Sequence, residues 1–360
     1  MKNLKIFENK KIIITGHTGF KGSWLTLCLK KLGANILGIS KDFPTSPSHY
    51  KVCGDLKNIK SKKFNICELL KLKKTIKTFN PDFIFHLAAQ PLVKKSYENP
   101  LETWESNTLG TINILDCLKN YSKKIYVVII TSDKVYNNVE KKSGYKESDA
   151  LGGSDPYSTS KAAAEFAIKS YFESFLKKKK NISLAIARAG NVVGGGDWSS
   201  NRLIPDCVRA WSKDKKVLLR NPKSTRPWQH VLEAVIGYII LASKLESKKI
   251  ISGEAFNFGP NTKKNYKVID CLNEIKKHWP TVSWKIKSNK KSFHETRLLK
   301  LNSNKAYKFL KWKSVLNFSE TMKMTAIWYK NYYGKKSKVI STYQINEYIK
   351  LFNQKSKFKI

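Results

Sequence analysis

The 360-residue sequence predicts an α/β fold in which a doubly wound parallel sheet is joined to a smaller mixed lobe near the C-terminal end. Three observations lead to this class. A run of β-branched residues, Ile12-Ile13-Ile14, enters a glycine-rich turn from Gly16 to Gly22. Apolar strand-like runs then alternate with helix-like segments as far as Arg188. Beyond that residue the segments are short, polar and aromatic, which favours a second lobe.

The glycine-rich turn has the spacing G-x-x-G-x-x-G, whereas many dehydrogenases have G-x-G-x-x-G. Glycines allow the backbone to approach a pyrophosphate, which the N-terminus of the following helix attracts. Glycine turns also join strands to helices for purely structural reasons. We expect a dinucleotide here, and the residues expected to line it are Gly16, Thr18, Gly19, Phe20 and Gly22.

The elements after this turn alternate between strand and helix. We expect strands at 36–39, 83–86, 125–131 and 183–188, and helices at 23–32, 68–79, 107–120 and 155–176. Repeated units of this kind favour a parallel sheet with helices on both faces. A helix at 232–245 and a strand at 255–258 are expected to rejoin the sheet. The segments 266–278 and 303–310 suit a lobe over the carboxyl ends of the strands, where such sheets bind ligands.

The domain division follows from this order. We expect a Rossmann-type dinucleotide-binding domain at residues 1–190 plus about 227–258. A smaller substrate-binding domain then comprises about 191–226 plus 259–360. No internal repeat interrupts this organisation.

Tyr157 and Lys161 stand four residues apart in the helix expected at 155–176, so they share one helix face. An ammonium group beside a phenol lowers the pKa of the phenol, so that the phenolate serves as a base. The same ammonium can contact the ribose next to a nicotinamide. An ordinary surface pair on a helix has this spacing too. Together with the glycine-rich turn, we interpret the pair as catalytic and cofactor-binding.

Polar residues follow the apolar strand expected at 125–131, in the order Ser132-Asp133-Lys134. They would therefore stand at the carboxyl edge of the sheet, beside the expected nicotinamide. A hydroxyl, a carboxylate and an amine in succession provide a hydrogen-bond donor, an acid and a base. A strand-to-loop turn with capping polar residues would look similar. In combination with Tyr157 and Lys161, we interpret these three residues as catalytic.

The formal net charge of +41 suggests nucleic acid or an anionic membrane as a partner. Only six of the 68 basic residues are arginine, and the lysines occur along the whole chain. The longest basic run, Lys177 to Lys180, lies between an expected helix and strand and suits a solvated loop. We therefore interpret the charge as a compositional bias that favours anionic substrates such as nucleotides, and expect no nucleic-acid function.

The cysteines and apolar runs predict a cytoplasmic protein without a membrane partner. No two of the six cysteines have C-x-x-C spacing, which indicates free thiols in a reducing compartment and no metal site. The N-terminus has no signal-peptide apolar region, and the longest apolar runs are too short to span a bilayer.

Seven segments resemble the extended short-chain dehydrogenase/reductase family, in its nucleotide-sugar dehydratase branch. They are GHTGFKGSWL from Gly16, FHLAAQPLV from Phe85, TSDKVY from Thr131, DPYSTSK from Asp155, RAGNVVGGGDW from Arg188, RLIPD from Arg202 and RPWQHVLE from Arg226. Within this branch the chain is most similar to the CDP-glucose 4,6-dehydratases. Asp133 distinguishes it from 4-epimerases, which typically lack that acid. Lys134 distinguishes it from dTDP-glucose and GDP-mannose dehydratases, which usually have glutamate there.

The resemblance implies conversion of CDP-D-glucose to CDP-4-dehydro-6-deoxy-D-glucose, for deoxysugar biosynthesis of O-antigen or another surface polysaccharide. Tyr157, helped by Lys161 and Ser132, would remove the 4-hydroxyl proton while hydride leaves C4 for NAD. The 4-ketone acidifies C5, Asp133 would protonate the departing 6-oxygen, and hydride would return to C6. Lys134 would act at C5, either as a neutral base or as a charge that stabilises the enolate.

The resemblance also implies NAD as a cofactor that is regenerated in each turnover. Besides the glycine-rich turn, the expected contacts are Asn65, Ile66, Ala88, Ala89, Gln90, Asn107, Tyr157 and Lys161. No acidic residue directly ends the second expected strand, where Ser40-Lys41-Asp42 stands. Asp42 or a hydroxyl could hold the ribose, and Lys41 could meet a 2′-phosphate. The choice of NAD over NADP therefore follows from the resemblance alone.

The substrate-binding candidates are Ser132, Asn191, Arg202 and Arg226. The guanidinium of arginine suits a pyrophosphate because it offers two parallel hydrogen bonds. Arg202 is equally compatible with an ordinary surface charge. His86 and His230 suit structural, hydrogen-bonded roles, and Trp228 suits either stacking on a base or packing.

Two other functions stay open at this point. One is another nucleotide-sugar dehydratase or epimerase of the same family, because these residues do not reveal the base of the nucleotide. The other is a regulatory protein that binds NAD without turnover, although Ser132, Tyr157 and Lys161 count against it. A homo-oligomer, dimer or tetramer, is usual for similar enzymes.

Overall fold

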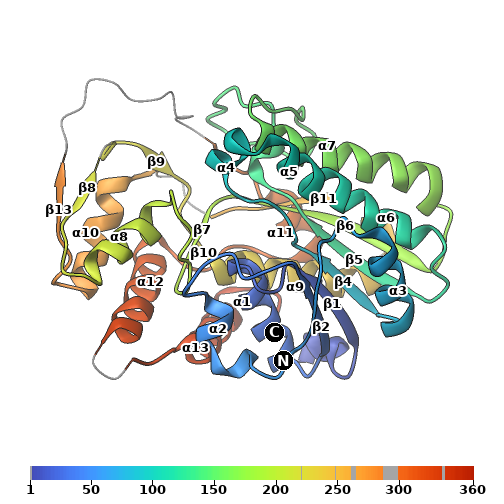
Figure 1. The fold of residues 1–360 in the computed structure, drawn as a ribbon, viewed down its shortest axis with the longest axis horizontal. Coiled ribbons are helices and arrows are strands. Elements are labelled where there is room, and N and C mark those ends of the chain that lie inside the picture. Colours follow the sequence, from blue (N-terminus) through green and yellow to red (C-terminus); the bar gives the residue numbers. More distant parts are fainter. Residues whose placement is uncertain (1, 220, 248, 261–264, 287–298, 335–336) are drawn as a thin grey trace.

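A seven-stranded parallel sheet forms the centre of the larger part of the molecule (Figure 1). The computed structural model describes residues 2–219, 221–247, 249–260, 265–286, 299–334 and 337–360. The strands lie in the order β11-β6-β5-β4-β1-β2-β3. Their bounds are β1 (Lys11–Thr15), β2 (Asn35–Ser40), β3 (Lys60–Lys63), β4 (Phe83–His86), β5 (Ile125–Ile130), β6 (Ile182–Ala189) and β11 (Ala255–Phe258).

Helices cover both faces of this sheet, which is why its central strands are buried and largely apolar (Figure 1). On one face lie α1 (Phe20–Lys31) and α9 (Val231–Ser247), and on the other lie α3 (Leu69–Phe79), α6 (Gly110–Lys119) and α7 (Pro156–Tyr171). Side chains alternate between the two cores, so Ile12 and Ile14 pack on the α1 side and Ile13 on the α3 side. This arrangement confirms the doubly wound α/β fold.

The connections reverse direction between β1 and β4, which are neighbours in the sheet. The chain passes from β1 outward to β2 and β3, then returns to β4 and continues to β5 and β6. Sheets of this topology bind ligands outside the carboxyl ends of the strands, in the crevice expected at such a point. The glycine-rich turn after β1 and the segment after β4 border it.

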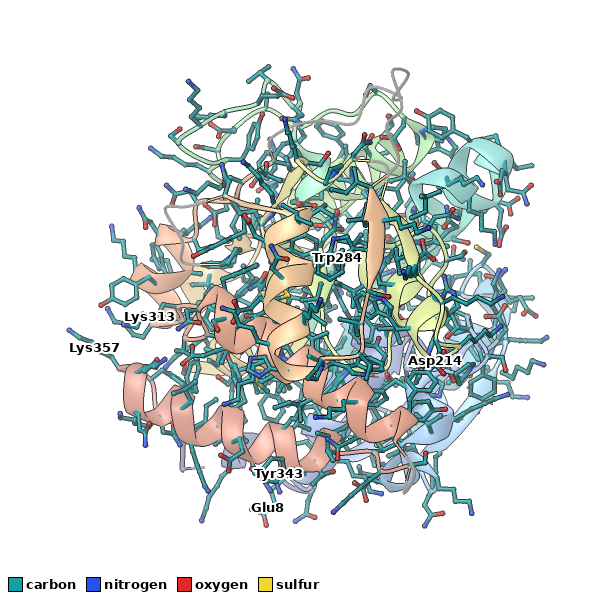
Figure 2. The ribbon with its side chains drawn as sticks, turned by 90° about the vertical axis from the view of Figure 1, so that its left-hand side faces the viewer. Glu8, Asp214, Trp284, Lys313, Tyr343 and Lys357 are labelled. Carbon is teal, nitrogen blue, oxygen red and sulfur yellow. The ribbon has the colours of Figure 1, made fainter. Side chains whose placement is uncertain are left out.

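Among the residues that the structure describes, the smaller lobe has three helices and short strand pairs. The helices are α8 (Leu203–Trp211), α10 (Val268–His278) and α12 (Phe318–Tyr333), and the pairs are β8 (Val217–Leu219) with β13 (Trp284–Ile286), β9 (Thr225–Arg226) with β12 (Tyr266–Lys267), and β7 (Val192–Val193) with β10 (Gln229–His230). Figure 2 views the molecule from this lobe, with Trp284 of β13 facing the reader. Nitrogen-tipped side chains, Lys313 and Lys357 among them, project around the outline of the whole molecule.

Short helical turns complete the described chain. They are η1 (Lys2–Phe7), α2 (His49–Val52), η2 (Gly54–Leu56), α4 (Val93–Glu98), α5 (Pro100–Trp104), η3 (Glu105–Leu109), η4 (Asp133–Val135), η5 (Phe172–Leu176), η6 (Lys249–Ile251) and α11 (Asn304–Leu310). The helix expected at 107–120 is therefore a π-helical turn followed by α6, and the helix expected at 155–176 ends in another such turn.

Two features of the fold differ from the sequence-based expectation. Strand β3 was not expected, because its residues KSKK are all exposed and show no apolar pattern; it is an edge strand. The C-terminal helix α13 (Ser341–Lys355) packs against α1, and its Tyr348 hydroxyl donates a hydrogen bond to Glu233 of α9 at 2.8 Å. This part of the chain, which we expected in the smaller lobe, thus lies against the first domain.

The described residues show no helix with both the length and the apolar composition needed to cross a membrane. They also contain no group of three or more histidine, cysteine, aspartate or glutamate side chains placed to hold a metal ion.

Candidate active site

Three segments that carry predicted site residues meet at the carboxyl edge of the sheet. They are the turn after β1, the residues after β5 and the first turns of α7. They meet because parallel strands all end at the same edge, and because α7 packs against η4, which follows β5.

The glycine-rich turn is so tight that side chains would not fit in it. Gly16 has a φ of +74°, and a Cβ atom there would lie 2.7 Å from the backbone nitrogen of Ala88. A Cβ on Gly22 would lie 2.0 Å from the carbonyl oxygen of Gly16. Gly19 is the N-cap of α1, and no side chain caps that end of the helix. Backbone N–H groups at the N-terminus of a helix attract an anion, so this turn fits the pyrophosphate of a dinucleotide.

Thr18 connects this turn to the end of β2. Its hydroxyl donates a hydrogen bond to the carbonyl of Asp42 at 2.6 Å. The hydroxyl of Ser40 lies 2.9 Å from Nδ1 of His17, and Lys41 forms an ion pair with Glu102 at 2.7 Å. The lysine that could have met a 2′-phosphate is therefore engaged with a carboxylate.

The other predicted cofactor contacts border the same crevice. Asn107 is fully buried and connects the segment after β4 to α7: its Oδ1 accepts from the backbone of Gln90 at 2.8 Å, and its Nδ2 donates to Ser160 of α7 at 2.9 Å. The half-buried Ala88 and Ala89 precede Gln90.

Asn65 and Ile66 follow β3. Oδ1 of Asn65 accepts a hydrogen bond from the backbone N–H of Cys67 at 3.1 Å, which leaves one lone pair of that oxygen for another donor. Ile66 is buried against Gly110 at the start of α6.

Helix α7 begins where Asp155 accepts hydrogen bonds from the backbone N–H groups of Tyr157 and Ser158, both at 3.0 Å. This cap places Tyr157 in the first turn and Lys161 one turn later, and both are buried. Burial raises the pKa of the Tyr157 phenol, while the Ser132 side chain opposes that shift. Burial, reinforced by the nearby Lys21, lowers the pKa of Lys161 from 10.5 to about 8, and Glu165 opposes it.

Ser132, Asp133 and Lys134 form a compact turn after β5. The Ser132 hydroxyl donates to Oδ1 of Asp133 at 3.1 Å and accepts from the backbone N–H of Lys134 at 3.2 Å. Burial raises the pKa of the Asp133 carboxyl, although the charge of Lys134 favours its ionised form. A Cβ on Gly190 would lie 2.8 Å from Oδ2 of Asp133, so this carboxylate lies directly against the backbone that follows β6.

Lys21 is a site residue that the sequence analysis missed. It occupies the second position of α1, and its Nζ lies 3.5 Å from the carbonyl oxygen of Gly190. Burial, with a further contribution from the charge of Arg202, lowers the pKa of Lys21 from 10.5 to about 8, and Asp133 opposes that shift. Its position inside the glycine-rich turn was a signal that could have identified it.

The predicted substrate-binding residues lie on the side of the smaller lobe. Arg202 is partly exposed, and its Nη1 forms an ion pair with Oδ2 of Asp197 at 3.1 Å. Asn191 is exposed at the end of β6. Arg226 pairs through its backbone with Tyr266 in the two-stranded β9–β12 sheet, and its side chain lies outside the described part of the chain. These three assignments stay predictions.

His86 and Trp228 have protein partners, whereas His230 is hydrogen-bonded only in part. Nδ1 of His230 accepts from the backbone N–H of Leu232 at 3.3 Å, but its buried Nε2 has no hydrogen-bond partner in the described part of the chain. Nδ1 of His86 lies 2.8 Å from the Thr15 hydroxyl and its Nε2 lies 3.2 Å from Thr111, and burial lowers the pKa of His86 from 6.5 to about 3. The indole N–H of Trp228 donates to the carbonyl of Tyr266 at 3.2 Å. These contacts show how both side chains pack.

Comparison with known proteins adds evidence from sequence. A family model described as GDP-mannose 4,6 dehydratase matches residues 13–325. CDP-glucose 4,6-dehydratase of Salmonella typhimurium is 38% identical over 355 residues, which is 97% of this chain and 99% of that protein. A dTDP-D-glucose 4,6-dehydratase of Dictyostelium discoideum is 30% identical over 264 residues, 69% of this chain and 58% of that protein.

Solved structures share the fold. Epimerase Mth375 from Methanothermobacter thermautotrophicus superposes with a TM-score of 0.79 at 22% identity, over 92% of this chain and 96% of that one. The dTDP-glucose 4,6-dehydratase of Bacillus anthracis in complex with NAD has a TM-score of 0.71 at 21% identity, over 89% and 97%. At these sequence identities the structural similarity shows that this chain shares their fold.

Proposed function

This chain belongs to the GDP-mannose 4,6-dehydratase family, and from that membership and the site geometry we propose that it is an NAD-dependent nucleotide-sugar 4,6-dehydratase acting on CDP-D-glucose. The product is CDP-4-dehydro-6-deoxy-D-glucose, a precursor for deoxysugar biosynthesis. The relatives include dehydratases and epimerases for several nucleotides. The choice of CDP-glucose is supported by the relative that is 38% identical over 97% of this chain.

The residues around the crevice fit NAD. The glycine-rich turn offers unhindered backbone at the N-terminus of α1 for the pyrophosphate, and Lys161 is buried one helical turn from Tyr157, where a ribose hydroxyl can be held. When bound, NAD supplies the hydride acceptor for C4 oxidation and the donor for C6 reduction. Ser40 and the Lys41–Glu102 ion pair at the end of β2 support NAD rather than NADP.

Tyr157 removes the proton of the sugar 4-hydroxyl. Because burial raises the pKa of its phenol, Tyr157 needs the positive charge of Lys161 and hydrogen bonding by Ser132 to act as a base at neutral pH. Lys161 provides that charge as long as it keeps its own proton.

Asp133 donates a proton to the departing 6-oxygen. Burial raises the pKa of its carboxyl, which favours the protonated form that a general acid requires. Lys134, the next residue, acts on the C5 proton once the 4-ketone has acidified it. The observation that carries this function is the convergence of Tyr157, Lys161, Ser132 and Asp133 at one sheet edge, beside a turn in which Gly16 and Gly22 leave no room for a Cβ atom.

The test is incubation of purified protein and NAD with CDP-, UDP-, dTDP- and GDP-glucose separately, in deuterated water. Mass spectrometry and NMR then follow the products. We expect a 4-keto-6-deoxy sugar with deuterium at C5 from CDP-glucose alone. Turnover of a different nucleotide sugar would keep the reaction and overturn the substrate. Binding of NAD without any turnover would instead favour a non-catalytic role.

The wider assignments belong to the same proposal. Residues 1–190 with about 227–258 hold NAD, and about 191–226 with 259–360 contribute to the sugar-nucleotide side, apart from α13. The protein acts in the cytoplasm, consistent with its six free cysteines.

It works as a homo-oligomer. In support, five large apolar side chains are exposed on the adjoining helices α5, η3, α7 and η5, namely Leu101, Trp104, Leu109, Phe166 and Phe175.

A further inference from the structure

Glu165 and Arg188 form a buried ion pair beneath the candidate active site, and the proposed chemistry does not use it. Both side chains are almost completely buried. Nε of Arg188 donates to the two carboxylate oxygens of Glu165 at 2.9 and 3.0 Å, and Nη2 donates to the second of them as well. A buried ion pair adds little net stability, because the cost of removing two charges from water offsets their attraction. We therefore asked what this pair holds in place.

The pair holds both ends of the segment that carries the proposed acid. At one end, the Thr131 hydroxyl donates to Oε1 of Glu165 at 2.6 Å. At the other end, Nη1 of Arg188 donates to the Tyr136 hydroxyl at 2.7 Å, and the guanidinium lies 4.9 Å from the centre of the Tyr136 ring. Asp133 stands between these two anchors, together with its neighbours in the turn.

The same pair reaches the helix that carries the proposed base. Glu165 lies on α7 one turn after Lys161 and two turns after Tyr157, and all three side chains are buried on one face. The Glu165 carboxylate raises the pKa of Lys161 against the lowering effect of burial. The Glu165 carboxylate thus contacts Thr131 and also influences the charge of Lys161, on which the proposed role of Tyr157 depends.

A further set of hydrogen bonds makes this arrangement rigid. The Tyr136 hydroxyl donates to Oδ1 of Asn257 on β11 at 2.8 Å. Nδ2 of Asn257 donates to the backbone carbonyls of Tyr145 at 2.9 Å and of Asn302 at 3.2 Å. Tyr136, which holds the far end of the segment that carries Asp133, is therefore itself fixed through Asn257 to the edge strand β11 and to the backbone at Tyr145 and Asn302.

We propose that the Glu165–Arg188 ion pair is a positioning device that sets Asp133 and Tyr157 at the correct separation, with Glu165 one turn from Lys161 on the same face of α7. This inference rests on the proposed function for the identity of acid and base. Neither residue touches the reacting atoms; each acts through the side chains it holds.

The test compares three variants with wild-type protein. Glu165→Gln leaves Arg188 without its counter-charge and is expected to lower stability. The double variant E165Q/R188M removes both charges and replaces the side chains with others of similar volume. It therefore separates the loss of positioning from the effect of leaving one buried charge unpaired. Glu233→Gln is the matched control, since Glu233 is also a buried, hydrogen-bonded carboxylate but accepts its bonds from Val315, Leu316 and Tyr348.

We expect folded E165Q/R188M to bind NAD with the affinity of wild type but to lose about 100-fold in kcat, because small displacements of catalytic groups have effects of that size. The alkaline limb of the pH–rate profile of Glu165→Gln should move to lower pH, since Lys161 loses a nearby carboxylate while Arg188 keeps its charge. Glu233→Gln should leave both kcat and the limb unchanged. A double variant with kcat within about threefold of wild type, together with an unmoved limb in Glu165→Gln, would overturn the inference.

A separate readout distinguishes this inference from the proposed function. Tyrosinate absorbance, taken as the difference between each protein and its Tyr157→Phe derivative, follows ionisation of Tyr157 without any substrate. Ionisation at higher pH in E165Q/R188M than in wild type supports the role of Glu165 even if no nucleotide sugar is turned over. Identical titrations would contradict it. Absence of turnover by the wild type would count against the proposed function instead.

Discussion

Tyr157 lies in an environment that disfavours its own ionisation, so its activity depends on neighbours rather than on the tyrosine itself. Burial raises the pKa of the phenol, whereas the Ser132 side chain and the charge of Arg202 favour the phenolate. The i, i+4 spacing of Tyr157 and Lys161 was evident in the sequence, because helix geometry translates spacing directly into a shared face.

The two halves of the reaction should respond to different residues. Tyr157→Phe removes the base for the first step and should lower C4 oxidation by about 10²–10⁴-fold. Lys134→Met should leave C4 oxidation partly intact and stop elimination. Reduction of NAD in a single turnover, together with deuterium incorporation at C5, measures the two steps separately. Unchanged overall turnover in Lys134→Met would remove Lys134 from the mechanism.

The pH dependence should show an alkaline limit near the pKa of Lys161, which burial lowers to about 8. Below that pH the ammonium is present and supports the Tyr157 phenolate; above it the charge, and with it the activity, is lost. Lys21→Met removes a nearby positive charge that lowers the pKa of Lys161, so the limit should move to higher pH. A kcat profile from pH 6 to 10 tests both points, and a limit that stays in place in Lys21→Met would contradict the second.

At the level of elements, the turn after β1 is constrained by contacts within its own backbone. A Cβ on Gly22 would lie 2.0 Å from the Gly16 carbonyl, so Gly22→Ala has to displace the turn that receives the pyrophosphate. We expect NAD affinity to fall at least about tenfold, measured by equilibrium titration. Gly54→Ala is the control, because a Cβ at Gly54 meets nothing within 4 Å. Equal NAD affinities in the two variants would argue against this use of the turn.

Glu233 of α9, which accepts a hydrogen bond from Tyr348 of α13, should make the stability of the fold depend on pH. Burial raises the pKa of Glu233 from 4.5 to about 7, against the hydrogen bonds from Leu316 and Tyr348. Between these two pH values the folded state binds more protons than the unfolded state, so the free energy of unfolding falls as pH rises. The expected loss from this group is on the order of 2–3 kcal/mol.

Glu233→Gln should remove that part of the pH dependence, because the amide does not titrate. Denaturant unfolding of wild type and variant at pH 5 and pH 7.5 provides the comparison. Between pH 5 and pH 7.5 the wild type should lose more free energy of unfolding than the variant does. A difference that is constant with pH would show that Glu233 does not titrate in this range.

Local patterning accounts for the elements that the sequence predicted well. β4 and β11 have the bounds expected from their apolar runs, because both are short, largely buried strands that begin after an acidic residue, Asp82 and Glu254 respectively. β3 escaped prediction because an edge strand forms through backbone hydrogen bonds to β2 and needs no apolar pattern. The packing of α13 on α1 is a contact between the two ends of the chain, which no local pattern reveals.

At the scale of the whole molecule, the exposed apolar side chains on α5, η3, α7 and η5 favour assembly with a second copy. Leu101 is 70% exposed and Phe166 is 56% exposed, which is costly in water for a monomer. We expect the double variant L101E/F166E to weaken self-association at least 100-fold, as measured by analytical ultracentrifugation, because two carboxylates would have to be buried.

Leu218→Glu is the control for that experiment. Leu218 is 53% exposed but lies on β8 in the smaller lobe, so its substitution should leave self-association unchanged. A wild-type protein that sediments as a monomer at micromolar concentration would contradict the oligomer.

The sequence by itself determined the fold class, the order of the central elements and most of the candidate site, because spacing along a helix and position after a strand are local properties. The tertiary structure alone decided which charges surround those residues. Lys21 reaches Gly190 from α1, and Glu165 meets Arg188 across α7 and β6. Such contacts join side chains that are far apart in the chain, and burial then amplifies their electrostatic effect because water no longer screens it.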